Sequence, residues 1–209
     1  MGWLILAAGR SRRFYGDKLL CVLPNSDKSV LEHTVRAYLD THQPVHVVIR
    51  EQHEEAKSLL NSLSVSFSVC PDSHLGMGHS LACGVQALEA SWSWMGVALA
   101  DMPKIQSVTL NDLLDLFLQN EACIVRPKFE GSGSRYTPAL ETKNELKTHF
   151  SGHPVIFPQS FFSTLKSLTG DVGAKSILEY YKCKIRYLKT SDSGVLIDVD
   201  TREQMTALV

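Results

Sequence analysis

The chain has 209 residues, of which 44% are hydrophobic and 21% charged, and this composition is typical of a folded globular protein. Lysine and arginine number 21, aspartate and glutamate number 22, and the formal net charge is −1. Proteins that bind nucleic acids generally carry a basic excess, so this balance argues against nucleic acid as a partner. The length suits one folding unit, and we expect a single domain over residues 1–209.

The sequence contains no pattern typical of export or of membrane insertion. The apolar run at 3–8 has no basic segment before it and is too short for a signal peptide. No apolar stretch is long enough to span a bilayer. The five cysteines are scattered singly, without the spacing of a zinc site. We therefore expect a cytoplasmic protein that makes no contact with a membrane.

Apolar patterning predicts strands that alternate with helices along the chain. The expected strands are residues 3–8, 45–49, 65–69, 95–100, 123–125, 185–188 and 195–199. The expected helices are residues 30–39, 54–63, 79–90, 108–118 and 173–181, with a last short helix that Thr201 caps. Such alternation with short connections predicts an α/β protein with a parallel sheet and helices on both faces. The polar segment 129–150 is expected to be an extended excursion from this sheet.

The first strand leads into a basic loop. In parallel sheets, ligands bind beyond the carboxyl ends of the strands, and here LAAGRSRR at 6–13 is followed by Lys18. Gly9 permits a sharp turn that brings backbone amides towards a ligand. Arg13 and Lys18 add the positive charge that a polyphosphate requires. Neither GxGxxG nor GxxxxGK[ST] is present, and a solvated basic turn is the alternative interpretation.

Carboxylates follow two other expected strands. Asp101 comes directly after the strand at 95–100, with no cation near it in sequence. Asp198 and Asp200 alternate along the last expected strand and would share one face. Asp101 and Asp200 together would form a cation site of the kind that Mg²⁺ occupies. Each aspartate could instead cap a helix.

Two further segments carry weaker signals. GMGHSLACG at 76–84 opens a helix with glycines that permit close contact with a base or a ribose, and Ser80 can donate a hydrogen bond from the helix start. His153 precedes a proline and is therefore held extended. Asp171 lies where a helix is expected to begin, so an N-cap role suits it as well as a catalytic one.

Taken together, these segments resemble the molybdenum cofactor cytidylyltransferases of the glycosyltransferase-A-like nucleotidyltransferase superfamily. Six motifs occur in the family's order: LAAGRSRR at 6–13 with Lys18, GMGHSLACG at 76–84, ALADMP at 98–103, GHPVIF at 152–157, GDVGAK at 170–175 and DVDT at 198–201. The resemblance implies a three-layer α/β/α fold with a mostly parallel, Rossmann-like sheet. It also implies transfer of a nucleotide monophosphate with release of pyrophosphate.

The resemblance assigns roles residue by residue. The implied nucleotide-binding residues are Leu6, Ala7, Ala8, Gly9, Ser11, Arg13, Lys18, Gly78 and Ser80. The implied catalytic residues are Arg13, Lys18 and Asp101. Asp101 and Asp200 would hold Mg²⁺, and His153 and Asp171 would face the acceptor.

The resemblance also indicates the substrates. The Ala-Ala-Gly form of the first loop is similar to the cytidine-using enzymes, whereas glycine at position 8 would be similar to the guanosine-using ones, so CTP is expected rather than GTP. The implied acceptor is molybdopterin, and a molybdoenzyme or its chaperone is an implied partner. One alternative is a nucleotidyltransferase for a sugar or polyol phosphate. Another is a non-catalytic chaperone that binds the molybdenum cofactor.

Overall fold

The computed structural model describes residues 1–10, 14, 16–131 and 149–208. Ser11 and Arg13, which the sequence places in the nucleotide site, lie outside the described residues, as does most of the expected excursion at 129–150. The strands form one sheet: β1 (Gly2–Ala7), β2 (Val45–Arg50), β3 (Ser66–Cys70), β4 (Trp94–Leu99), β5 (Ile124–Glu130), β6 (His149–Ser151), β7 (Val155–Pro158) and β8 (Ile185–Thr190).

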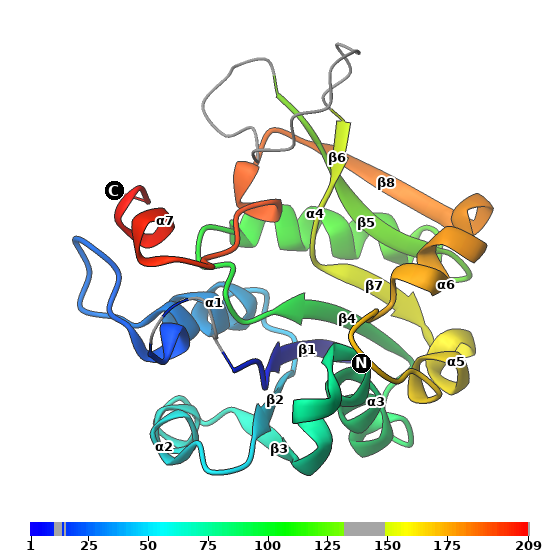
Figure 1. The fold of residues 1–209 in the computed structure, drawn as a ribbon. Coiled ribbons are helices and arrows are strands. Elements are labelled where there is room, and N and C mark those ends of the chain that lie inside the picture. The colour runs from blue at the N-terminus through cyan, green and yellow to red at the C-terminus, as the bar shows by residue number, and fades with distance from the viewer. Residues whose placement is uncertain (11–13, 15, 132–148, 209) are drawn as a thin grey trace.

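The sheet has the order β3-β2-β1-β4-β7-β5-β6, and β8 also pairs with β5 (Figure 1). Strands β1 to β4 are parallel to one another, and β5 is parallel to β8. Strand β7 is antiparallel to both β4 and β5, and β6 is antiparallel to β5. The expected α/β fold with a mostly parallel sheet is therefore confirmed, with an antiparallel insertion in one half.

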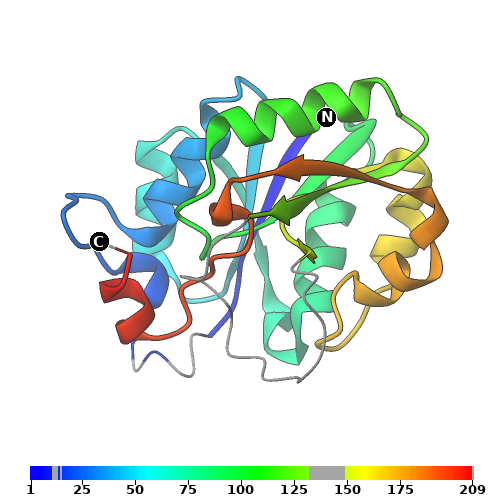
Figure 2. The ribbon, with the colours of Figure 1, turned by 90° about the horizontal axis from the view of Figure 1, so that it is seen from above.

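Helices cover both faces of the sheet, because successive residues of each strand point to opposite sides. In β1, Trp3 and Ile5 pack into one core with α1 (Val30–Leu39), α2 (Glu54–Ser62) and α4 (Ser107–Leu118). Leu4 packs into a second core with α3 (Met77–Leu88), α5 (Phe162–Lys166) and α6 (Lys175–Tyr180). Figure 2 shows α4 and α3 on opposite sides of the sheet. The expected three-layer arrangement is confirmed.

Trp3 anchors the first core. It is fully buried, its Nε1 donates to Thr41 Oγ1 at 2.8 Å, and its ring packs edge-on against Tyr38 and Trp94. Gly96 on the adjacent strand leaves room for this ring, because a Cβ at Gly96 would overlap the atoms of the indole. The large indole of Trp3 on β1 is thus accommodated because the adjacent position on β4 is a glycine.

The expected strand at 195–199 is wrong. Residues Ser193–Val195 form a short 3-10 helix, capped by Asp192, whose Oδ1 accepts from Gly194 N at 2.8 Å. Further along, Val199 N donates to the carbonyl of Asp101 at 2.9 Å. The apolar alternation reflects burial of Val195 and Val199 in the first core and not pairing in a ladder.

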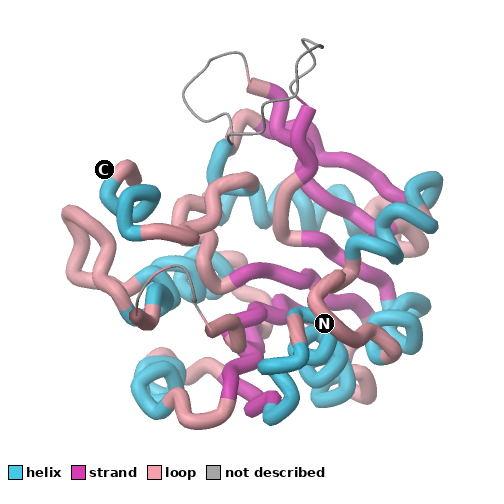
Figure 3. The backbone as a smooth tube through the Cα atoms, in the orientation of Figure 1, coloured by secondary structure: helices cyan, strands magenta, loops and turns pink. Residues whose placement is uncertain are grey.

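The tube in Figure 3 shows that the chain after this segment ends in a last short helix, α7 (Arg202–Thr206). The expected cap is confirmed, because Thr201 and Gln204 form a reciprocal capping box at its start. Across the described ranges, the structure contains no helix with both the length and the apolar character needed to cross a membrane.

We expect Gly96→Ala to lower the free energy of unfolding by about 1–3 kcal/mol, because overpacking a rigid core forces neighbouring side chains to shift. Urea denaturation followed by tryptophan fluorescence measures this change. Gly9→Ala is the matched control, since a Cβ at Gly9 meets no atom within 4 Å. Equal unfolding midpoints for the two variants would contradict the packing argument.

Candidate active site

A cavity of about 500 Å³, here named the first cavity, opens at the carboxyl ends of β1 and β4. General rules for parallel sheets predict a ligand site at this edge. Its wall brings together residues that are distant in sequence: Leu6, Ala7, Ala8, Gly9, Arg10, Lys18, Leu19, Ser73, His74, Gly76, Met77, Ser80, Leu99, Ala100, Asp101, Asp171, Asp198 and Asp200. Most of the residues expected from sequence to bind a nucleotide or a metal therefore face one space.

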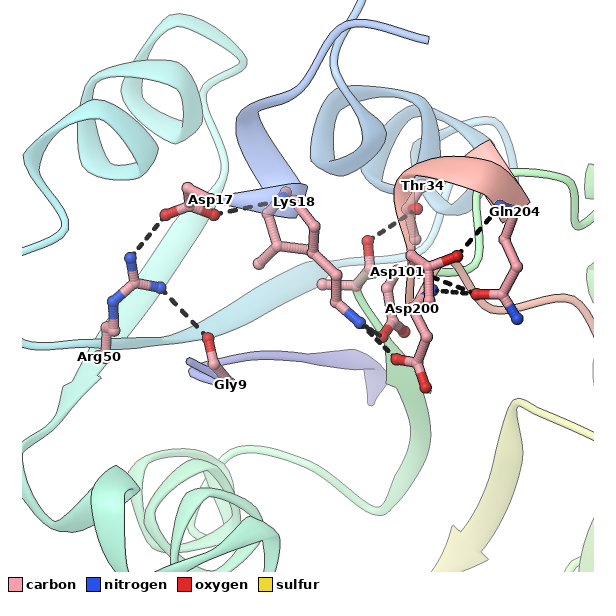
Figure 4. A network of polar contacts seen from close by, with 11 residues as sticks. Gly9, Asp17, Lys18, Thr34, Arg50, Asp101, Asp200 and Gln204 are labelled. Carbon is pink, nitrogen blue, oxygen red and sulfur yellow. Dashed lines mark hydrogen bonds and ion pairs between the residues drawn. The ribbon is translucent and has the colours of Figure 1, made fainter. Parts of the chain in front are cut away.

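Lys18 lies at the centre of the polar contacts in the first cavity (Figure 4). Its Nζ donates to Asp101 Oδ2 at 2.6 Å and to Asp200 Oδ1 at 3.0 Å. Burial opposes the charge on Lys18, but the two carboxylates outweigh burial and raise the pKa of its ammonium group. Lys18 is therefore a charged group that neutralises part of the acidic wall.

Asp17 holds the turn that presents Lys18. It caps the 3-10 helix Lys18–Leu20 through Oδ1, which accepts from Leu19 N at 3.2 Å. Its Oδ2 lies 2.5 Å from Arg50 Nη2 and 2.6 Å from His53 Nε2. Burial opposes ionisation of Asp17, yet its contacts with His53 and Arg50 lower its pKa to about 2.

Arg50 links this turn to the first loop, because its Nη1 donates to the carbonyl of Gly9 at 3.3 Å (Figure 4). Arg50 ends β2, and His53 follows three residues later. The contacts of Asp17 with these two residues could not be predicted from local sequence, because the parallel pairing of β1 with β2 brings them together.

The loop after β4 is fixed on several sides. Ala100 N donates to Leu6 O at 3.1 Å, and the hydroxyl of Thr34 donates to Ala100 O at 3.0 Å. The backbone of Asp200 donates to Gln204 Oε1 at 2.7 Å, which attaches the other carboxylate to the start of α7. Both acidic side chains therefore come from backbones whose positions are determined by hydrogen bonds.

Three carboxylates converge beside Lys18. Asp101, Asp198 and Asp200 each offer an oxygen, and these oxygens lie within 4.8 Å of one another. Asp101 Oδ1 is buried and has no hydrogen-bond partner among the described residues. Burial, followed by the charges of Asp101 and Asp200, raises the pKa of Asp198. An all-oxygen donor set with an unsatisfied buried oxygen fits a hard divalent cation.

The glycines at the start of α3 make a close contact with the chain around Gly170. A Cβ at Gly76 would overlap the backbone of Gly170, and Gly78 N donates to Gly170 O at 2.7 Å. Gly78 packs against this backbone and is not in the wall of the first cavity, whereas Gly76 and Ser80 are. The same contact brings Asp171 into that wall.

A second cavity, of about 550 Å³, adjoins the first and shares Leu6, Met77 and Leu99 with it. Its other lining residues are Leu81, Val97, Arg126, Ser151, His153, Val155, Phe157, Val172, Gly173, Ala174, Lys175, Leu178, Glu179, Lys182, Ile185 and Tyr187. The two residues expected to face an acceptor are thus separated, with His153 in the second cavity and Asp171 in the first.

Comparisons with known proteins identify the family to which the chain belongs. Residues 3–187 match the MobA-like NTP transferase domain family. The purine catabolism protein PucB of Bacillus subtilis is 28% identical over 214 residues, covering 96% of this chain and 92% of PucB. The bifunctional protein GlmU of Mycobacterium marinum is 33% identical over 122 residues, which cover 54% of this chain and only 24% of GlmU.

Solved structures share the fold. Rv0371c of Mycobacterium tuberculosis superposes with a TM-score of 0.75 at 23% identity, covering 99% of this chain and 95% of that one. A CMP:2-keto-3-deoxy-manno-octonic acid synthetase complexed with CTP superposes with a TM-score of 0.74 at 14% identity, covering 99% and 97%. With the family match spanning most of its length, the chain belongs to the MobA-like NTP transferases and is a nucleotidyltransferase.

Proposed function

We propose that this protein transfers CMP from CTP to the phosphate of a small acceptor, the molybdopterin of the molybdenum cofactor, and releases pyrophosphate. The observation that carries the proposal is the bridge from Lys18 to Asp101 and Asp200 beneath the Ala-Ala-Gly loop. CTP as donor is supported by two neighbours of the same fold whose names include cytidine nucleotides: the synthetase complexed with CTP and a 4-diphosphocytidyl-2C-methyl-D-erythritol synthase.

The nucleotide would occupy the first cavity. In this proposal Leu6, Ala7, Ala8, Gly9, Lys18 and Ser80 bind CTP, all from the wall of that cavity. Ser11 and Arg13, outside the described residues, would complete the triphosphate site. Gly78 would act indirectly, because its contact with Gly170 sets the position of the residues on either side of it. Asp198 and Arg10 join the proposed site from the structure.

Asp101 and Asp200, with Asp198 beside them, would hold Mg²⁺. Bound there, the ion would neutralise phosphate charge on the nucleotide. A structure of Rv0371c complexed with manganese, 22% identical and with a TM-score of 0.73, supports a divalent cation for this fold. Lys18 would stabilise the negative charge that develops on the departing pyrophosphate.

The chain's contribution to the reaction would be positioning and charge neutralisation. An oxygen of the acceptor phosphate attacks the α-phosphorus of CTP, the bond to the β-phosphate oxygen breaks, and pyrophosphate leaves in line. No covalent enzyme intermediate is needed, so holding the two substrates in register supplies much of the rate. Asp17, through its contacts with Arg50 and His53, would keep Lys18 directed at the triphosphate.

The acceptor would enter the second cavity, where His153 is the proposed contact, while Asp171 would approach it from the first cavity. Burial, and then the neighbouring Arg126, lowers the pKa of His153 to about 4, so its imidazole is neutral at physiological pH. A molybdoenzyme or its chaperone would receive the product in the cytoplasm. A polyol phosphate is the alternative acceptor, which the erythritol derivative in a neighbour's name supports.

Pyrophosphate release tests the proposed function. The purified protein with Mg²⁺ should release pyrophosphate with CTP and molybdopterin, and CTP should exceed GTP, ATP and UTP in kcat/KM. Erythritol phosphate in place of molybdopterin tests the alternative acceptor. Folded protein that gives no release with any of these pairs, while still binding molybdopterin, would favour a non-catalytic chaperone.

Substitution of Asp101 and Lys18 should remove the chemistry without removing the fold. Asp101→Asn should abolish pyrophosphate release and weaken binding of Mn²⁺, measured by electron paramagnetic resonance of the free ion, because it removes one anionic ligand. Lys18→Gln should lower kcat by roughly 100-fold. Asp115→Asn, an exposed carboxylate on α4, is the matched control. Normal turnover in the Asp101 variant would overturn the metal assignment.

The neutral state of His153 predicts how stability depends on pH. Because its folded pKa of about 4 lies below the ordinary value of 6.5, the unfolded chain binds a proton first as the pH falls. The free energy of unfolding should therefore drop between pH 6.5 and pH 4, by at most roughly 3 kcal/mol from this group. His153→Gln should flatten urea-denaturation stability over that range.

The control for this series is His74→Gln, which removes an exposed imidazole and should keep the wild-type profile. A His153→Gln protein that loses stability as steeply as wild type between pH 6.5 and pH 4 would contradict the buried, neutral state of His153.

A further inference from the structure

The second cavity contains a cation to which the proposed reaction gives no role. Arg126 lines this cavity from β5, and its Nη2 donates to the carbonyl of Gly152 at 3.2 Å. Its Nε is buried and has no hydrogen-bond partner in the structure. Within the ranges that the structure describes, no carboxylate lies within ion-pair distance of this guanidinium group.

A buried donor that carries charge is unfavourable when nothing accepts from it. Burial lowers the pKa of Arg126, which reports the same desolvation. The guanidinium group stays charged at physiological pH, since its ordinary pKa is far above it. The guanidinium group of Arg126 therefore suits a ligand group that accepts hydrogen bonds and carries negative charge.

His153, which lines the same cavity, also has a buried polar atom without a described partner. Its Nδ1 is buried without a hydrogen-bond partner, although its ring interacts with the backbone of Val97. The charge of Arg126 helps to lower the pKa of His153, so the two side chains interact electrostatically. A neutral imidazole cannot compensate the charge of Arg126. Arg126 and His153 thus line one cavity, and each has a buried polar atom without a partner among the described residues.

Most of the rest of the wall is apolar. Leu81, Val97, Val155, Phe157, Leu178 and Ile185 contribute aliphatic and aromatic surface to the same cavity. Lys175 and Lys182 are exposed cations in the wall, and the carboxylate of Glu179 lies 4.0 Å from Lys175 Nζ. The half-buried positive charge of Arg126 is therefore set in a largely apolar cavity, which is the usual composition of a small-molecule site.

We propose that Arg126 determines acceptor specificity by binding an oxyanion of the acceptor, a phosphate or a carboxylate, inside the second cavity. The apolar wall then packs against the uncharged body of the same molecule, beside His153 in the same lining. This inference rests on the proposed function in taking the second cavity as the acceptor site. Arg126 lines only the second cavity and Asp101 only the first, so this oxyanion is distinct from the phosphates of the nucleotide.

Direct binding of simple oxyanions tests the subsite without any turnover. Inorganic phosphate and malonate are titrated separately by isothermal calorimetry, at constant ionic strength, into wild type, Arg126→Gln, Arg126→Lys and Lys189→Gln. We expect the dissociation constant of the preferred anion to rise about tenfold or more in Arg126→Gln, because a charge-assisted pair of hydrogen bonds is lost. The dissociation constant of Arg126→Lys should lie between those of wild type and Arg126→Gln, since lysine keeps the charge but loses the planar arrangement of donors.

The controls locate the effect. Lys189→Gln removes an exposed cation on the neighbouring strand β8 and should bind the anion as wild type does. Lys18→Gln alters the first cavity. In a protein that already carries Lys18→Gln, adding Arg126→Gln should raise the dissociation constant of the anion by the same factor as it does in wild type. Equal affinity in wild type and Arg126→Gln, for both anions, would overturn the proposal, provided that thermal unfolding shows both proteins folded.

Steady-state kinetics with the accepted substrate pair gives a second reading. Arg126→Gln should raise the KM for the acceptor about tenfold or more and leave the KM for CTP unchanged. Equal rises in both KM values would indicate a structural role and would contradict specificity at Arg126. If no acceptor supports pyrophosphate release, the proposed function fails. The calorimetric titrations still test the anion site, because they show whether anion binding depends on Arg126.

Discussion

One ammonium group holds the candidate site together. Lys18 binds Asp101, 83 residues later, and Asp200, 182 residues later, and so joins the first loop, the end of β4 and the segment before α7. Carboxylates that approach one another closely repel unless a cation lies among them. A cation at this position is therefore a condition for the site's shape, whether the cation is the ammonium of Lys18 or, in the proposed complex, a divalent ion beside it.

The position of Lys18 depends in turn on a second charged group. Asp17 caps the turn that carries it, and Arg50 and His53 fix Asp17 from the end of β2. Charges of opposite sign therefore alternate across the edge of the sheet, from Arg50 through Asp17 and Lys18 to the aspartates. The formal net charge of −1 does not reveal this local separation, which is why overall charge argued against nucleic acid but gave no indication of a phosphate-binding site.

Most of the fold and part of the site could be predicted because the relevant signals are local. Runs such as 3–8 are buried on both faces and therefore read as strands, whereas β6 and β7 are too short for periodicity, and their antiparallel pairing depends on distant partners. At 195–199 the apolar alternation predicted a strand that does not form, because the backbone N–H of Val199 donates to the carbonyl of Asp101 and not to a neighbouring strand. The carboxylates nevertheless meet, since this hydrogen bond joins the segment before α7 to the loop after β4.

Arg126 shows why the rest of the site could not be predicted. A charged residue between apolar neighbours in a strand is usually solvated, and the packing of β5 against β7 and β8 partly covers this one. The two adjoining cavities consequently differ in electrostatics. In the first, Lys18 is compensated by aspartates, so a ligand there must bring both signs of charge, as a metal–nucleotide complex does. In the second, no described carboxylate pairs with Arg126, and the proposed ligand would bring an anionic group to it. This difference would direct two anionic substrates to separate cavities.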